Sequence, residues 1–373
     1  MRATITPLLL CLPLLAASCS GQAPPADIRL SGWSIGVLAG TELLTFRPDR
    51  PRAPLSRVNL RKTWDERHFF RTPLEKERAA GDYPVLHLLA SSPEDGLAAI
   101  NLIELATRDD GPLMVMDVRT SKVRSAIPIS DSSAAARFVP GTAGQLLARY
   151  QDNLSPEGGA RLAVFDSVTG SAIRKIEDCV PPGPSPLFLA KPWRLICVGG
   201  AKPTRLMSAG DWTETGALGA RFADKHTLLD AWESTLLSED VEEGKRNLIA
   251  WKEGGSPVAI ATELFAGVPR AKWFLAGRGD RVIRCQMKAP ALLRSYRASD
   301  GTLLAEFELG KLVFHHAVHP EGHSVALLVD DKIVLIDVEN GKITSRIPYE
   351  GTRGERAVFW VKAPAVPSKT NLP

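Results

Sequence analysis

The sequence lacks most of the features that indicate a chemical activity. Its 373 residues include 5 cysteines and 6% aromatic residues, and 46 Lys+Arg nearly balance 42 Asp+Glu. The net charge of +4 is small, and acids and bases are interleaved, so no basic stripe indicates a nucleic-acid partner. No Walker loop, HExxH zinc motif or GxGxxG dinucleotide motif is present. We therefore assign no catalytic, metal-binding or cofactor-binding residue.

Long apolar runs are also scarce, apart from one near the N-terminus. Residues 7–17, PLLLCLPLLAA, are too short and too interrupted by Pro13 to span a bilayer. With Arg2 before them, they have the charge and length typical of a signal peptide. Cys19 follows small residues at Ala16 and Ser18, a pattern that resembles the bacterial lipobox, whose cysteine is lipidated. Ordinary secretory cleavage at the same bond is the alternative.

The lipobox resemblance implies a location as well as a processing event. Residues 1–18 would be a signal peptide, and residues 19–27 a tether lipidated at Cys19. Several acyl chains would make the anchoring effectively permanent and would be the chain's sole attachment to the membrane. Ser20 after the cysteine fits sorting to the outer membrane of a Gram-negative host. We expect an outer-membrane lipoprotein facing the periplasm or the cell surface, or alternatively a soluble periplasmic or secreted protein.

Three cysteines remain after the signal peptide and Cys19 are set aside. Cys179 and Cys197 flank the turn-rich segment VPPGPSP, and an exported protein can form disulfides, so a bridge between them is a candidate. The alternative is that both are buried thiols, like Cys285, because cysteine packs as a small hydrophobic residue. No CxxC pair indicates a metal site.

A repeated pattern predicts the fold. Residues 319–343, HPEGHSVALLVDDKIVLIDVENGKI, contain two short apolar runs separated by tight turns, the second turn carrying Asn-Gly. Such runs suit strands covered on both faces, and Asn-Gly is a strong hairpin signal. Similar units occur at residues 113–129, 162–176 and 292–309, and weaker ones near Asp211, Trp251 and Phe46. Four-stranded units at a period of roughly 40–50 residues are typical of a β-propeller.

The ends of the chain predict how the propeller closes. The first unit lacks an inner strand, and residues 355–363, ERAVFWVKA, form an isolated strand at the other end. Pairing the two would complete one blade and cover both edges. We therefore predict an all-β fold, a seven-bladed propeller of four-stranded antiparallel blades, over residues 28–362. An insertion at residues 63–84 joins the first two blades, and residues 363–373 form a flexible tail.

The repeated units, including the HPEG and SPEDG turns at His319 and Ser92, resemble blades of WD-repeat and YVTN-type propellers, a quinoprotein-like fold. The terminal Trp-Asp dipeptide of true WD repeats is missing, so the resemblance is to a divergent member. It implies architecture alone, since such propellers include scaffolds, binding modules and some enzymes.

Two short motifs have a catalytic and a structural interpretation. GWSIG, residues 32–36, matches the nucleophile elbow around Ser34, but that motif requires a strand-to-helix turn rather than a propeller hairpin. His315, His316, His319 and His323 have a spacing that suggests zinc on a helix, yet Pro320 and Gly322 break any helix there. We therefore expect structural roles for these residues.

Loop lengths predict the binding surface. The loops at residues 106–112, 150–160 and 238–246 are long, and the excursion at residues 63–84 should open on the same face. Extensions gathered on one face of a repeat protein often bind partners. The anchors that we expect in this excursion are aromatic, histidine and arginine side chains: Trp64, His68, Phe69, Phe70 and Arg71. The alternative is a small helix that packs its own aromatic residues against the propeller.

These patterns favour a monomeric, non-enzymatic propeller, lipid-anchored in the bacterial envelope, that binds a protein or a ligand as a scaffold. We expect its partner to be another envelope protein. The alternative is a propeller enzyme, similar to quinoprotein dehydrogenases or lactonases, that uses the axial channel.

Overall fold

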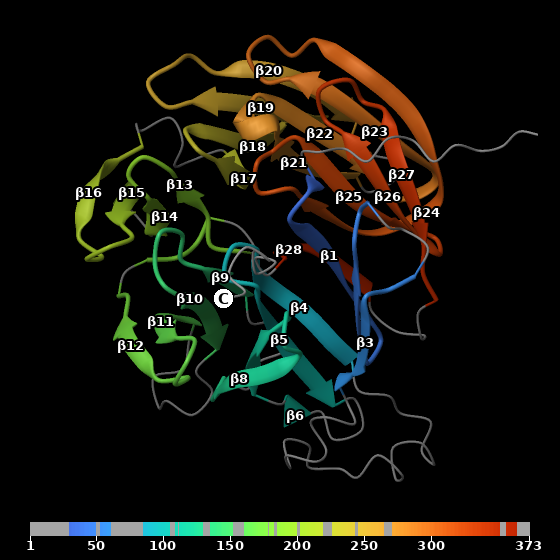
Figure 1. Ribbon diagram of the computed structural model, residues 1–373. Coiled ribbons are helices and arrows are strands. Elements are labelled where there is room, and N and C mark those ends of the chain that lie inside the picture. The colour runs from blue at the N-terminus through green and yellow to red at the C-terminus, as the bar shows by residue number, and fades with distance from the viewer. Residues whose placement is uncertain are drawn as a thin grey trace, which may run out of the picture.

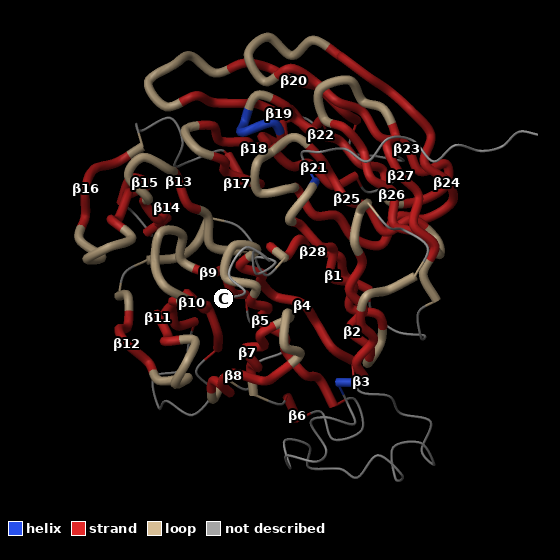
Figure 2. Tube along the Cα trace, in the orientation of Figure 1, coloured by secondary structure: helices blue, strands red, loops and turns tan. Residues whose placement is uncertain are grey.

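The computed structural model describes residues 30–49, 53–60, 85–104, 109–110, 112–129, 135–151, 160–177, 179–182, 185–199, 202–218, 226–242, 245–264, 271–350 and 356–363. Antiparallel sheets follow one another around a central axis, and the chain passes around the ring in sequence order (Figure 1). Strands account for nearly all the regular structure (Figure 2). The protein is a β-propeller.

Five of the sheets are separate blades. The first contains β28 (Arg356–Lys362), β1 (Trp33–Ala39), β2 (Glu42–Phe46) and β3 (Ser56–Asn59). The second contains β4 (Val85–Ser92), β5 (Leu97–Glu104), β6 (Asp109–Asp110), β7 (Leu113–Asp117) and β8 (Lys122–Ile127). The third contains β9 (Ala135–Phe138), β10 (Gln145–Gln151), β11 (Ala160–Asp166) and β12 (Ala172–Lys175). The fourth contains β13 (Phe188–Leu189), β14 (Arg194–Gly199), β15 (Lys202–Ser208) and β16 (Glu214–Ala217). The fifth contains β17 (His226–Trp232), β18 (Thr235–Glu242), β19 (Lys245–Lys252) and β20 (Val258–Leu264).

The remaining strands form one seven-stranded sheet. Its members are β21 (Ala271–Ala276), β22 (Arg281–Gln286), β23 (Lys288–Arg297), β24 (Leu303–Val318), β25 (Ser324–Val329), β26 (Lys332–Asp337) and β27 (Ile343–Pro348). A short 3-10 turn, η3 (Gly277–Gly279), joins β21 to β22. The prediction of seven separate four-stranded blades is therefore wrong, because the described strands make five separate blades and this larger sheet.

The continuity of β24 explains the difference. Its first part pairs with β23 as far as Leu312, and its second part pairs with β25 from Val313 onward. The sequence between these parts, ELGKL, has Gly310 but no proline or turn dipeptide to end a strand. One sixteen-residue strand thus belongs to both halves of the sheet.

The predicted pairing of the first and last strands is confirmed. β28 pairs with β1 along its whole length, from Trp33 opposite Lys362 to Ala39 opposite Arg356. Gly36 allows the close approach here, since a Cβ at that position would lie 2.4 Å from the Phe359 ring. The pairing covers the edge of β1 and places β28 as the innermost strand of the blade.

The turns at one end of the blades repeat the same hydrogen bonds. In six places a backbone N–H after the third strand donates to a carbonyl in the turn between the first two strands. The donors are Val118, Ser167, Ala209, Glu253, Ala298 and Val338, and the acceptors are Gly96, Gly144, Trp193, Ser234, Asp280 and His323. In the turn between the third and fourth strands, an aspartate side chain accepts two backbone N–H groups. These aspartates are Asp117, Asp166 and Asp337. The repeated aspartate and glycine of the sequence pattern are therefore turn residues.

The core lies between neighbouring sheets. Fully buried aliphatic and aromatic side chains from facing sheets form separate clusters around the ring, for example Ile35, Phe46 and Trp360 against Leu328 and Leu335. A further cluster packs the two halves of the seven-stranded sheet against each other. Among the described residues, no helix is long and apolar enough to cross a membrane.

His316, on β24, should make stability depend on pH. Its ring stacks on Phe274 at 3.9 Å between centroids. Burial, with smaller contributions from His315 and Lys272, lowers the pKa of His316 well below its ordinary value of 6.5. The unfolded chain therefore binds a proton more readily, so this stability is present above about pH 6.5 and is lost as the pH falls below it.

We expect the free energy of unfolding to fall between pH 7.5 and 5.5 by about 1.4 kcal/mol more in the wild type than in a His316→Phe variant. Urea unfolding of both proteins at both pH values measures this difference. An equal fall in the two proteins would contradict the assignment.

Candidate functional site at the mouth of the axial channel

The innermost strands end around a cavity of about 580 Å³. Its walls come from β4, β9, β13, β17 and β24 and from the turns that follow them. Neighbouring inner strands contact one another around the axis, for example β4 with β9 and β13 with β17. The cavity is therefore the mouth of the axial channel, on the face that carries the turns between first and second strands.

Four aromatic side chains contribute to the wall of this cavity. Phe138, Phe188 and Trp232 line it together with Trp193, which remains 40% exposed. Gly141, with a positive φ, makes room for Trp193, since a Cβ there would lie 3.0 Å from the indole ring. An exposed tryptophan held at the edge of an apolar cavity is typical of a binding anchor.

Two buried ionisable groups lie at the channel mouth. Arg137, on β9, lines the cavity, and its Nη1 donates to the carbonyl of Pro186 at 3.2 Å. Asp230, on β17, accepts the N–H groups of Ala231 and Leu275, both at 2.8 Å. Burial lowers the pKa of Arg137 and raises the pKa of Asp230, and the attraction between the two groups opposes both shifts. The protein thus keeps two ionisable groups buried beside its channel mouth at an electrostatic cost.

The acids at the rim of the cavity have partners of their own. Glu94 and Lys362 form an ion pair at 2.5 Å, and Glu233 lies 4.0 Å from Lys191. The Ser92 hydroxyl donates to Asp95 at 2.6 Å. The lysine contacts compensate the charge of Glu94 and Glu233, whereas the hydroxyl satisfies Asp95 with a hydrogen bond.

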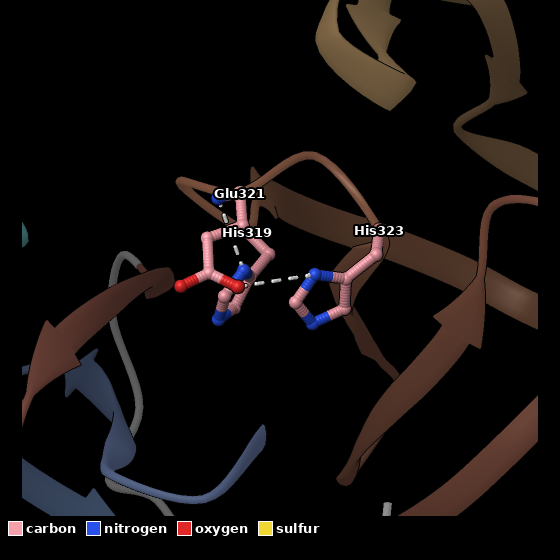
Figure 3. A group of neighbouring side chains, drawn as sticks. All are labelled: His319, Glu321 and His323. Carbon is pink, nitrogen blue, oxygen red and sulfur yellow. Dashed lines mark hydrogen bonds and ion pairs between the residues drawn. The ribbon is translucent and has the colours of Figure 1, made fainter. Parts of the chain in front are cut away.

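Beside the cavity, His319, Glu321 and His323 come together in the turn after β24 (Figure 3). One ligand atom from each lies within 4.8 Å of the others, so the group has the residue types of a metal site. His323 Nδ1 lies 3.7 Å from Glu321 Oε2. The histidine spacing gave no indication of Glu321, although the sequence HPEGH places this residue between His319 and His323.

The hydrogen bond of His319 makes a metal site chemically unfavourable. The Glu321 N–H donates to His319 Nδ1 at 3.1 Å, so Nδ1 carries no proton and a neutral ring is protonated at Nε2. Metal-binding histidines instead donate their second ring N–H and coordinate through the other nitrogen. His319 resembles the turn aspartates in its role, and its ring packs edge-on against Trp33 and Trp360. We assign this cluster a structural role.

A His319→Phe variant separates the two contributions of this side chain. Phenylalanine keeps a ring between the tryptophans but cannot accept the Glu321 N–H, so we expect a loss of about 1 kcal/mol in the free energy of unfolding. A Glu321→Gln variant, which changes an exposed side chain, should stay within about 0.5 kcal/mol of the wild type. Chemical denaturation measures both, and wild-type stability of His319→Phe would refute the role of Nδ1.

The expected partner-binding residues lie outside the described part of the chain. This applies to Trp64, His68, Phe69, Phe70 and Arg71, and also to the lipidation candidate Cys19. The expectation of a long loop at residues 238–246 is wrong, because β18 and β19 continue as a paired hairpin to Glu242 opposite Lys245.

Other candidates of the sequence have clear positions. Cys179 and Cys197 are joined by a disulfide, with their Cα atoms 4.9 Å apart. Cys285 is a buried free thiol, and burial raises its pKa to about 12. Ser34 lies within β1 opposite Val361 and is 7% exposed, so it occupies no nucleophile elbow.

Comparison with known proteins finds solved structures that are similar to this chain. No protein-family model matches the sequence, and no curated protein does. AztD from Citrobacter koseri is 8% identical, with 90% of this chain and 99% of that chain covered and a TM-score of 0.47. BamB from Moraxella catarrhalis is 12% identical over 86% of each chain, with a TM-score of 0.41. The C-terminal WD40 domain of Sif2 is 13% identical over 88% of this chain and 83% of that chain, with a TM-score of 0.45. With identities and TM-scores this low, the likenesses assign no activity.

Proposed function

We propose that this protein is a lipid-anchored, extracytoplasmic β-propeller that binds another protein of the bacterial envelope at the mouth of its axial channel. The cavity with Trp193 at its edge carries the proposal. Its volume of about 580 Å³ lies in the range of small-ligand sites and could hold one or two large side chains of a partner. An exposed tryptophan beside such a cavity is the residue type most enriched among binding hot spots.

The chain ends support a particular orientation of this site. β1 begins and β28 ends on the cavity face, where Trp33 pairs with Lys362 and the Lys362 N–H donates to the carbonyl of Pro93. Pro93 itself lines the cavity. If Cys19 is lipidated, the eleven peptide links to Leu30 reach at most roughly 40 Å. Under this proposal, the channel mouth faces the membrane surface at short range.

Native mass spectrometry of tagged full-length protein, extracted from host membranes in mild detergent, tests the proposal. We expect a stoichiometric second protein with the wild type and its loss with Trp193→Ala. An Ile173→Ala variant is the matched control, because Ile173 is 50% exposed on the edge strand β12. Equal recovery with both variants would contradict the site. A chain without a second protein but with a metal ion or quinone would favour the propeller enzyme instead.

A further inference from the structure

Arg137 is a cation at the channel mouth, and among the described residues no carboxylate forms an ion pair with its guanidinium. No carboxylate oxygen of the described residues lies within 4.0 Å of its nitrogens, whereas Glu94 and Glu233 at the rim each have a lysine within that distance. Within the described part of the chain its guanidinium makes one hydrogen bond, through Nη1, and a guanidinium has five N–H donors in a fixed fork. Several donors therefore remain for a group that enters the cavity.

Asp230 attracts the positive charge of Arg137 electrostatically but forms no ion pair with it within 4.0 Å. Both of its oxygens already accept backbone N–H groups, from Ala231 and from Leu275 of the neighbouring sheet. Arg137 and Ala231 both line the cavity, whereas Asp230 does not. An entering anion would meet the arginine first.

We propose that this cavity receives an apolar or aromatic group that bears a carboxylate, with Arg137 as the partner of the carboxylate. Arginine is suited to this because its planar fork matches the two oxygens of a carboxylate. The aromatic walls from Phe138, Phe188 and Trp232 would contact the apolar part. A free aromatic acid and the C-terminal residue of a protein both have this chemistry. The proposal rests on the proposed function only in using the same cavity.

Titration calorimetry with full-length protein tests the inference. The probes are 3-phenylpropionate, its amide, and a short peptide ending in phenylalanine as the free acid or as the amide. We expect saturable binding of at least one acid, with its amide at least tenfold weaker. An Arg137→Gln variant should weaken acid binding at least tenfold and leave amide binding unchanged. Binding of the peptide acid alone would identify a chain terminus as the source, and binding of 3-phenylpropionate alone a small molecule.

A second variant controls for loss of folding in Arg137→Gln. Arg137→Gln leaves Asp230 without its cation, so the double variant Arg137→Gln/Asp230→Asn, which neutralises the pair, is measured beside it. Equal binding of acid and amide, unchanged acid binding in a folded Arg137 variant, or no binding of any probe would overturn the inference. Capture of the envelope partner through Trp193 is a separate readout, so its survival in Arg137→Gln would leave the proposed function standing.

Discussion

A Trp360→Ala variant should lose about 3–5 kcal/mol in its free energy of unfolding, the largest single-residue effect that we expect. Trp360 lies on β28, is 1% exposed, and pairs with Ile35 across the closing seam. Its indole N–H donates to the Ala317 carbonyl on β24 at 3.1 Å. Truncation would therefore leave a cavity and remove a side-chain hydrogen bond where the first blade meets the seven-stranded sheet. Urea denaturation followed by circular dichroism measures the loss.

Trp193→Ala provides the comparison for this variant. The same side chain is removed, but Trp193 is 40% exposed and leaves no enclosed cavity. We expect a change below about 1 kcal/mol. Similar stability of the two variants would show that closure by β28 contributes little.

Replacing both Cys179 and Cys197 with alanine should cost about 3 kcal/mol, because the disulfide closes a loop between residues 18 positions apart. The bridge holds the segment before β13 against β14, where Val180 and Val198 exchange two backbone hydrogen bonds. These elements support the wall of the channel mouth that contains Phe188 and Trp193. Thermal and chemical unfolding of the oxidised wild type and the double variant measure the effect.

Alkylation of the cysteines tests the disulfide, and a Cys285→Ala variant, which lacks the free thiol, is its control. Cys285 is buried, and its raised pKa keeps the thiol protonated and unreactive at neutral pH. Native protein should therefore resist alkylation at Cys179, Cys197 and Cys285, and unfolding without a reductant should make Cys285 alone of these three reactive. Alkylation of Cys179 or Cys197 without reductant would contradict the disulfide.

Local turn chemistry made much of the fold predictable from sequence. Residues such as Asp337 and Gly341 have one physical role, since the carboxylate accepts two backbone N–H groups and the glycine adopts a positive φ. Ring closure was also predictable, because the first unit lacked an inner strand. The wrong prediction of separate blades at β24 also has a local cause. Gly310 permits a turn but does not require one, and the strand continues through it.

The candidate site was less accessible to sequence analysis. Arg137, Trp193 and Asp230 lie in three different repeats, and no local pattern links them. Arg137 and Asp230 lie within the innermost strands β9 and β17, and Trp193 lies in the turn after β13, so only the closed ring brings them together at the channel mouth. Loop length directed attention to the opposite end of the blades, whereas the cavity is built from short turns.

The seam between β1 and β28 also constrains the order of folding. A ribosome makes β1 well before β28, which is its hydrogen-bonding partner and the last of the described strands. Until then, a fully buried strand of the finished protein, Trp33–Ala39, has one side unpaired and its apolar residues uncovered. Contacts between such distant segments form slowly, and exposed strand edges in the interval favour aggregation. We therefore expect that truncation of β28, which leaves that side of β1 permanently unpaired, produces a chain that associates with itself.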